Sequence, residues 1–300
     1  MRSKKISCLA LWPAVLFGLP LAPPNAFSAS PARSIAQEVD AEFGYVGGAT
    51  TRGGGGNIGA VDEWTADLKY ILSPQITKNV LLRFGAEWQR STFGVSDQAP
   101  VPSVLQQANA IIGFDYQLTD EWLLRAELRP GIYSDFKDVS WRDVNAPLLV
   151  GAAYLANADL QWFFGVRVDG RSHYPALPAV GVRWRFADNW TLNLVLPKPR
   201  LEHDLNDRLK AYLSAAIELD TFRVGDHFGD NQGRSDLNHA ILDYFEARVS
   251  LGLSWRIRPS VNVEADAGYM VHRRFDFFDQ DLIFRSDPAP YVQIACHFRF

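Results

Sequence analysis

The sequence contains almost no cysteine and no apolar run long enough to cross a membrane as a helix. Its two cysteines are Cys8 and Cys296, and Cys8 lies in a segment that we expect to be removed, so an intramolecular disulfide is excluded. The longest strongly apolar run beyond that segment covers residues 146–158, whereas a spanning helix needs about 20 residues. The fold must therefore be held together by side-chain packing and backbone pairing.

An excess of positive charge is also missing. The formal net charge is −4, and removing Arg2, Lys4 and Lys5 with the leader would change it to −7. This balance gives no reason to expect nucleic acid as a partner. The sequence also lacks the cysteine and histidine spacing of a zinc site, and we expect neither a metal nor another cofactor.

The N-terminus has the layout of a secretory signal peptide. A basic start precedes the uncharged apolar stretch 8–24, and small residues follow at Ala26, Ser28 and Ala29, which is the order used by export signals. We expect cleavage after Ser28, which divides the chain into a signal peptide, 1–28, and a mature protein, 29–300. An N-terminal membrane anchor is the alternative, but four prolines interrupt the apolar stretch and argue against a spanning helix.

Alternation of apolar and polar residues recurs along almost the whole mature chain. In residues 244–257 nearly every second side chain is apolar, and the intervening ones are charged or small. Residues 62–72, 79–89 and 261–272 repeat the pattern. A period of two is typical of β-strands that have one apolar and one polar face.

Short and long connections alternate between these segments. The short ones consist of an apolar residue, three mostly polar residues and a second apolar residue, at 76–80, 118–122, 186–190, 205–209 and 257–261. The longer ones are rich in Gly, Asp and Pro, and include 46–59, 224–239 and 275–288. Outer-membrane barrels combine short periplasmic turns with longer outer loops in this way.

We therefore predict an all-β fold, a transmembrane antiparallel β-barrel of about 14 strands. The hairpin through Pro197 and Pro199 has a very short outer connection, and without it 12 strands remain; an even number suits either count. The strands are expected at 37–47, 62–73, 79–93, 104–118, 121–135, 146–156, 159–169, 177–187, 189–197, 200–205, 208–223, 241–257, 261–275 and 289–300.

In such a barrel the apolar face contacts lipid and the polar face lines the lumen. Candidate lumen-lining residues, which could form a constriction, carry both signs: Arg83, Glu87, Arg125, Glu127, Arg129, Arg167, Arg183, Arg185, Arg248 and Glu264. They could pair with one another as ion pairs within a water-filled lumen, or they could form a selectivity constriction in which acids face bases. The first is favoured, because a strongly selective pore usually concentrates one sign. The arginines of 125–129 and 183–185 could also bind anionic solutes, although pairing with acids demands less.

Two other segments suggest alternatives to a plain wet lumen. The inward positions of residues 146–156 are apolar, and with Leu123 and Phe163 they could bind a hydrophobic ligand or, as we favour, pack beneath an inward-folded loop. His173 lies next to Ser172 and close to Asp169, which invites comparison with a Ser–His–Asp triad. Adjacency in sequence does not establish the hydrogen bonds that define a triad, so we do not expect an enzyme.

The chain ends in YVQIACHFRF, residues 291–300, which alternates up to a terminal phenylalanine. We expect this strand to close the barrel against residues 37–47. The ending resembles the C-terminal signature of bacterial outer-membrane proteins, which implies that Phe298 and Phe300 are recognised by the barrel-assembly machinery. The mature chain as a whole also resembles an uncharacterised family of proteobacterial outer-membrane barrels, in runs such as LSPQITKNVLLRFGAEWQR and NLVLPKPRLEHDL.

These features predict a protein of the Gram-negative outer membrane, surrounded by lipid and lipopolysaccharide. A passive channel or uptake pore for a small solute is the function that we favour. A barrel without transport, serving envelope structure or surface interactions, is the alternative, and an outer-membrane hydrolase comes third.

Overall fold

The computed structural model describes residues 35–95 and 99–300, and this part of the chain is all-β. The expected signal peptide, 1–28, lies outside the described residues. Short 3-10 turns occur in the connections: η2 (Trp141–Asp143), η3 (Asp230–Gln232), η4 (Ser235–Leu237) and η5 (Phe278–Gln280). The strands are β1 (Ile35–Gly53), β2 (Gly56–Thr77), β3 (Val80–Gly94), β4 (Val104–Gln117), β5 (Trp122–Leu128), β6 (Gly131–Ser134), β7 (Val144–Asn145), β8 (Leu148–Leu155), β9 (Leu160–Val168), β10 (Ala176–Ala187), β11 (Trp190–Asn193), β12 (Arg200–Asp204), β13 (Leu209–Arg223), β14 (Ile241–Arg258), β15 (Val261–Phe277), β16 (Leu282–Ser286) and β17 (Ala289–Arg299).

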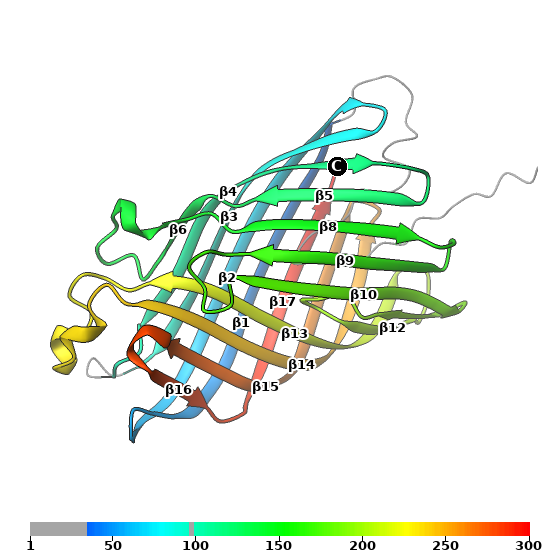
Figure 1. Ribbon diagram of the computed structural model, residues 1–300. Helices are drawn as coiled ribbons and strands as arrows, with labels where there is room; N and C mark the ends of the chain where they lie inside the picture. Colours follow the sequence, from blue (N-terminus) through cyan, green and yellow to red (C-terminus); the bar gives the residue numbers. More distant parts are fainter. Residues whose placement is uncertain (1–34, 96–98) are drawn as a thin grey trace, which may run out of the picture.

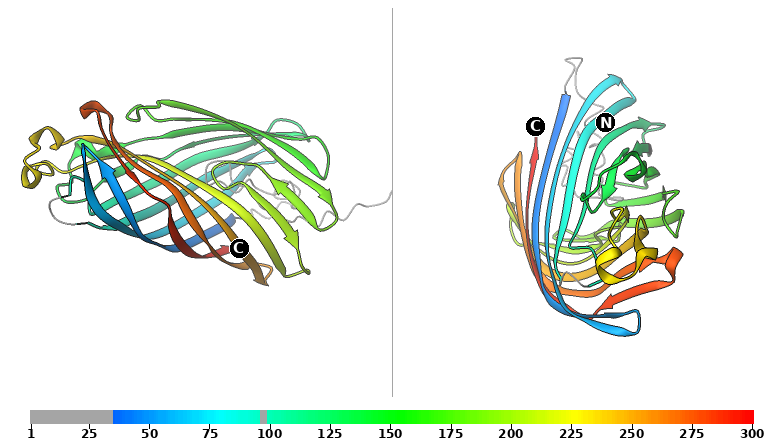
Figure 2. Two further views of the ribbon diagram at one scale, coloured as in Figure 1. Left: turned by 90° about the horizontal axis from the view of Figure 1, so that it is seen from below. Right: turned by 90° about the vertical axis from the view of Figure 1, so that its left-hand side faces the viewer.

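The strands form one closed antiparallel barrel (Figures 1 and 2). Three strands of the barrel wall are interrupted, and each appears as two labelled segments: β5 and β6, β7 and β8, and β16 and β17. The 17 labelled segments therefore make 14 wall strands. The prediction of 14 strands is confirmed, and the hairpin of β11 and β12 belongs to the barrel. No helix in the described part of the chain is long and apolar enough to cross a membrane.

The ring closes where β17 pairs with β1. The pairing runs from Glu38 opposite Arg299 to Val46 opposite Tyr291, and the backbones of Gln37 and Phe300 exchange hydrogen bonds of 3.0 and 2.9 Å. Unpaired backbone groups are costly inside a membrane, so this pairing removes the edges that an open sheet would expose. The expected closure of the last strand on the first is confirmed.

The connections differ at the two ends of the barrel. The five predicted short connections, together with the turn between β8 and β9 at residues 156–159, join strands at one end, which we call the short-turn end, and the other end is the loop end. Residues 46–59 were expected to be an outer loop, and this is wrong: β1 and β2 continue as a hairpin whose turn is Gly54–Gly55, both with positive φ. Irregularities at Val46/Ala49 and Thr51/Arg52 keep the strands paired while they interrupt the alternation, which hid the strands from the sequence pattern.

Residues 275–288, expected to be another outer loop, also extend the wall. Strand β15 continues to Phe277, and β16 starts at Leu282 and pairs with β15 and β1. Because of a register shift, Arg248 lies opposite Met270 while Ala247 lies opposite His272. The extra residue reverses which side chains of β15 face inward, and the strand beyond it points Arg273, Phe275 and Phe277 into the barrel.

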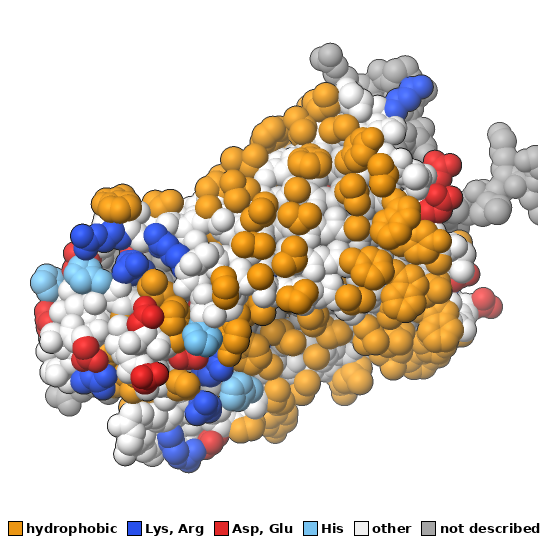
Figure 3. Space-filling model, viewed as in Figure 1, with side chains coloured by type: hydrophobic (Ala, Val, Ile, Leu, Met, Phe, Trp, Pro, Cys, Tyr) orange, Lys and Arg blue, Asp and Glu red, His pale blue; other side chains and the backbone are white. Residues whose placement is uncertain are grey.

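The face of the barrel shown in Figure 3 carries a broad apolar band on its outer surface. Leu251 on β14 is 68% exposed, and neighbouring strands add exposed Leu213, Tyr269 and Ile294. The alternate residues of the same strands are inward and mostly buried, for example Ser250 and Ser254. Charged side chains gather instead around the loop end (Figure 3), so the band has the distribution expected of a surface that contacts lipid.

We predict that Leu251→Arg destabilises the barrel much more than Leu205→Arg. Leu251 lies in the apolar band, whereas Leu205 is an exposed leucine in the short turn between β12 and β13. An arginine in the middle of the lipid-facing band costs about 2–4 kcal/mol, and one at the interface about 0–1 kcal/mol. Denaturant unfolding of both variants in lipid vesicles measures the free energy of unfolding; equal losses would contradict a membrane-facing β14.

A charged lumen as the candidate functional site

The loop end of the lumen is filled by buried apolar side chains. They come from the inward faces of eight strands and from the connections that fold over them, and we call them the loop-end cluster. Large apolar side chains therefore pack against one another across this end of the lumen. The loop-end cluster consists of Val61, Phe93, Val101, Leu105, Tyr133, Phe222, Val224, Phe228, Leu237, Ala240, Leu242, Tyr244, Phe275, Phe277, Leu282 and Phe284.

A buried ion network lies next to this cluster. The guanidinium of Arg273 donates to Glu63 at 2.5 Å and to Glu246 at 2.7 Å, and Arg248 pairs with Glu246 and lies 3.7 Å from Glu63. The hydroxyl oxygen of Tyr244 lies within hydrogen-bond distance of both carboxylates, 3.0 Å from Glu63 and 2.8 Å from Glu246. Two acids therefore share two arginines, and the four residues join β2, β14 and β15.

Five of the predicted lumen residues form a second network on β3, β4 and β5. Arg83 contacts Glu127 at 3.3 Å, Arg129 contacts Glu87 and Glu127 at 3.0 Å, and Arg125 donates to Asp115 at 2.5 Å. All are buried or nearly so. The residues face inward, and these arginines pair with acids of the wall.

The other predicted residues are distributed around the wall. Arg167 contacts Asp169 at 3.3 Å and Asp220 at 3.0 Å, and Glu264 accepts from Arg200 at 2.8 Å. Arg183 is buried on β10, and Arg185 lies 4.0 Å from Asp159 in the short turn between β8 and β9. Because β8 and β9 stand between β5 and β10 in the sheet, the arginines of 125–129 and 183–185 belong to separate parts of the wall.

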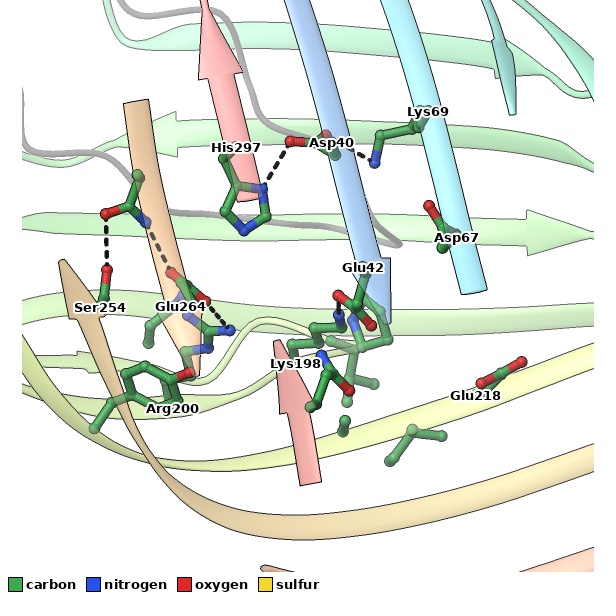
Figure 4. Close-up of a pocket in the computed structure, with 18 of the residues that line it drawn as sticks. Asp40, Glu42, Asp67, Lys69, Lys198, Arg200, Glu218, Ser254, Glu264 and His297 are labelled. Atoms are coloured by element: carbon green, nitrogen blue, oxygen red, sulfur yellow. Dashed lines mark hydrogen bonds and ion pairs between the residues drawn. The ribbon is translucent and has the colours of Figure 1, made fainter. Parts of the chain in front are cut away.

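Between these networks lies a cavity of about 1560 Å³ that reaches the residues of the short turns. Asp40 lies on its wall and contacts Lys69 at 3.2 Å and His297 at 2.7 Å (Figure 4). Asp40 also contacts Arg299 at 2.8 Å. Lys198 extends into the cavity and pairs with Glu42 at 2.6 Å (Figure 4). The cavity is thus lined by both signs of charge.

Hydrogen bonds between residues that line the cavity cross the lumen. Gln107 donates to Gln89, and Gln89 donates to Glu218 at 2.5 Å. Gln89 lies on β3 and Glu218 on β13, which stand on widely separated parts of the ring. The lumen is therefore narrowed here as well as closed by the loop-end cluster.

The connection between β11 and β12 folds into the barrel. Its Val195 packs on Leu123, Ala153 and Phe163, which form a buried apolar cluster on the inner wall. This confirms the interpretation that the apolar face of residues 146–156 lies beneath an inward-folded segment. The same fold carries Lys198 to Glu42, a position that the sequence pattern of a hairpin turn did not indicate.

Ser172 and His173 have contacts other than those of a triad. The hydroxyl of Ser172 and the backbone N–H of His173 both donate to Asp243 at 3.0 Å, while the imidazole packs on the rings of Tyr174 and Phe278. Asp169 contacts Asn145 and Arg167. Within residues 35–95 and 99–300, no three potential metal ligands come together either.

Residues 78–300 match a family model described as a domain of unknown function, DUF6268. The chain belongs to this family. No curated protein matches the DUF6268 chain in sequence. The family membership agrees with the resemblance noted in the sequence, which was to a barrel family without a known activity.

Solved structures of outer-membrane proteins are similar to the DUF6268 barrel. An outer membrane channel from Pseudomonas putida F1 is 7% identical over 93% of this chain and 100% of its own, with a TM-score of 0.47. The toluene transporter TodX of P. putida is 11% identical over 93% and 92%, with a TM-score of 0.41. The NanC porin is 12% identical over 87% and 98%, also with a TM-score of 0.41.

We predict that Arg273→Met strongly destabilises the DUF6268 barrel. Arg273 is fully buried, and its loss would leave Glu63 and Glu246 to share Arg248; breaking a buried ion pair costs about 3–5 kcal/mol. Arg234→Met is the matched control, because Arg234 pairs with Asp236 at 2.7 Å in an exposed loop and exposed pairs contribute little. Free energies of unfolding measure both, and a small loss for Arg273→Met would contradict the network's role.

Proposed function

We propose that this protein is a passive channel of the Gram-negative outer membrane that gives a small solute access to the periplasm. The observation that carries the proposal is the cavity of about 1560 Å³, because it is lined by charged side chains and reaches the short turns. In the proposed orientation these turns face the periplasm and the long connections face outward, as in other barrels of this class. Charges of both signs keep such a lumen wettable, which suits passage without a strong preference for one ion.

The proposed location implies two kinds of partner. The apolar band would contact phospholipid and lipopolysaccharide, and the last strand would be recognised by the barrel-assembly machinery during insertion. The ring of Phe298 stacks against that of Phe300, with centroids 6.5 Å apart, and Phe300 is exposed. This accessibility supports Phe298 and Phe300 as the recognised pair.

A barrel without transport is the second candidate, and the loop-end cluster favours it. Large side chains such as Phe275, Phe277 and Phe284 are fully buried there, so a straight axial route would require the cluster to separate. A barrel of this kind would serve envelope structure or bind partners through its loops.

Conductance of the purified protein in planar bilayers separates the two candidates. A channel gives discrete current steps, whereas a closed barrel gives none. We further predict that Lys198→Gln makes the current more cation-selective, because it removes a positive charge from the cavity and leaves Glu42 unpaired. The reversal potential across a KCl gradient should shift towards that of K⁺.

Lys78→Gln is the matched control for this prediction, since Lys78 is an exposed lysine of the short turn between β2 and β3. It should leave the reversal potential close to that of the unmodified protein. An equal reversal potential for both variants would mean that ions do not pass Lys198, and absence of current steps would favour the barrel without transport.

A further inference from the structure

The wall of the barrel is incomplete between β10 and β13. Strand β11 pairs with β10 only over Arg183–Ala187, and β12 pairs with β13 only as far as Ser214. In the left view of Figure 2 these two short strands occupy only the short-turn end of the wall. Beyond them, in the described part of the chain, no strand lies between residues 176–181 of β10 and residues 217–220 of β13. We call this gap the window.

The window exists because the chain leaves the wall. After Asn193 the connection turns inward, where Val195 joins the apolar cluster of the inner wall and Lys198 reaches Glu42 on β1. The carbonyls of Pro197 and Pro199 accept hydrogen bonds from Ile217 and Ala215, at 2.9 and 3.0 Å. These contacts form the border of the window on the side of the short-turn end.

The cavity of the lumen extends through the window to the outer surface. Its lining includes inward residues such as Glu218 and Asp220, and also membrane-facing ones: Ile217, Leu219 and Phe245. Ile217 is 38% exposed on the outer face. Because successive residues of a strand point to opposite faces, a cavity that touches both sets on β13 passes from one side of the wall to the other.

Two backbone groups that the facing edges of the window could leave unpaired are absent or paired. The carbonyl of Val182 accepts from the N–H of Leu194, the residue directly after β11. By alternation the backbone of residue 178 points to the same edge, and Pro178 has no N–H to leave unpaired there. On the other edge the carbonyl of Leu219 accepts from the guanidinium of Arg167. Capped edges of this kind lower the cost of an opening in a membrane wall.

The loop end of the window is fixed from outside. The connection between β9 and β10 lies over the outer face of β13 and β14, where Ser172 and His173 donate to Asp243 at 3.0 Å. Asp243 also accepts from Thr221 of β13 at 2.6 Å. The window thus has defined borders on all sides, and this gives the Ser172–His173–Asp243 contacts a structural role.

We propose that the window admits small uncharged apolar molecules from the membrane into the lumen, an inference that rests on the proposed channel function. The window opens within the apolar band, and its borders are apolar: Leu177, Pro178, Ile217, Leu219 and Phe245. A solute dissolved in the lipid can cross such borders without exchanging lipid for water, whereas a hydrated ion cannot. This route bypasses the loop-end cluster, which closes the axial one.

Uptake of the apolar fluorophore N-phenylnaphthylamine by Gram-negative cells tests the window. Cells that express the protein should take up the probe several-fold faster than cells with an empty vector. Ala216→Trp should reduce uptake to the vector level, because Ala216 lines the cavity beside the window. Ala211→Trp is the matched control on the membrane-facing side of the same strand and should leave uptake unchanged.

A second pair of substitutions tests the same route within one folded protein. Pro178→Cys and Leu219→Cys, in a Cys296→Ala background, place thiols on the two edges for a cleavable bis-maleimide. Cross-linking should abolish the excess uptake, and reductive cleavage should restore it. Uptake at the vector level for the unmodified protein, or uptake insensitive to both Ala216→Trp and the cross-link, would overturn the window.

Current steps in planar bilayers keep this test separate from that of the channel. Ions enter the lumen from water, so a conducting protein without probe uptake refutes the window and leaves the channel function intact. Probe uptake without current steps refutes passage of ions and leaves the lateral route.

Discussion

The structure depends on one constraint: inside a membrane, each backbone N–H and C=O group needs a partner within the protein. A ring of 14 wall strands closed by β17 and β1 meets this requirement around most of the wall, and leaves strand edges only at the window. Closure also separates the side chains into two sets, because alternate residues of each strand must face either lipid or lumen. The same constraint applies at the two edges of the window. Pro178 has no N–H to leave unpaired there, and the guanidinium of Arg167 donates to the carbonyl of Leu219.

The interior is organised as a closed end and an open end. At the loop end, apolar side chains and the Glu63–Arg273 network fill the lumen, and these charges are paired because a lone buried charge would be costly. Towards the short turns the charged side chains surround a cavity instead, and Lys198 enters it from the wall. A solute that reaches this cavity from the side of the loop end therefore needs an entrance other than the barrel axis. The window between β10 and β13 provides one.

Much of this architecture can be predicted from alternation alone. Residues 244–257 assign Leu251 to lipid and Arg248 to the lumen, and the structure agrees. The assignment fails where the period breaks: the irregularity in β15 turns Arg273, Phe275 and Phe277 inward, and the irregularities in β1 hid a hairpin over 46–59. Pattern reasoning cannot detect an extra residue in a strand without knowing its partner. Nor does it indicate that Lys198 points into the lumen, because that depends on a contact with distant Glu42.

The most direct test of the central claim measures which side chains of β14 contact lipid. Single cysteines at Val249, Leu251, Leu253, Ser254 and Arg256, in a Cys296→Ala background, would carry a fluorophore in lipid vesicles. Quenching by nitroxide-labelled lipid should be strong at 249, 251 and 253 and weak at 254 and 256, with the opposite order for aqueous iodide. Uniform quenching along the strand, or the reverse alternation, would contradict a closed barrel with an apolar exterior and a charged lumen.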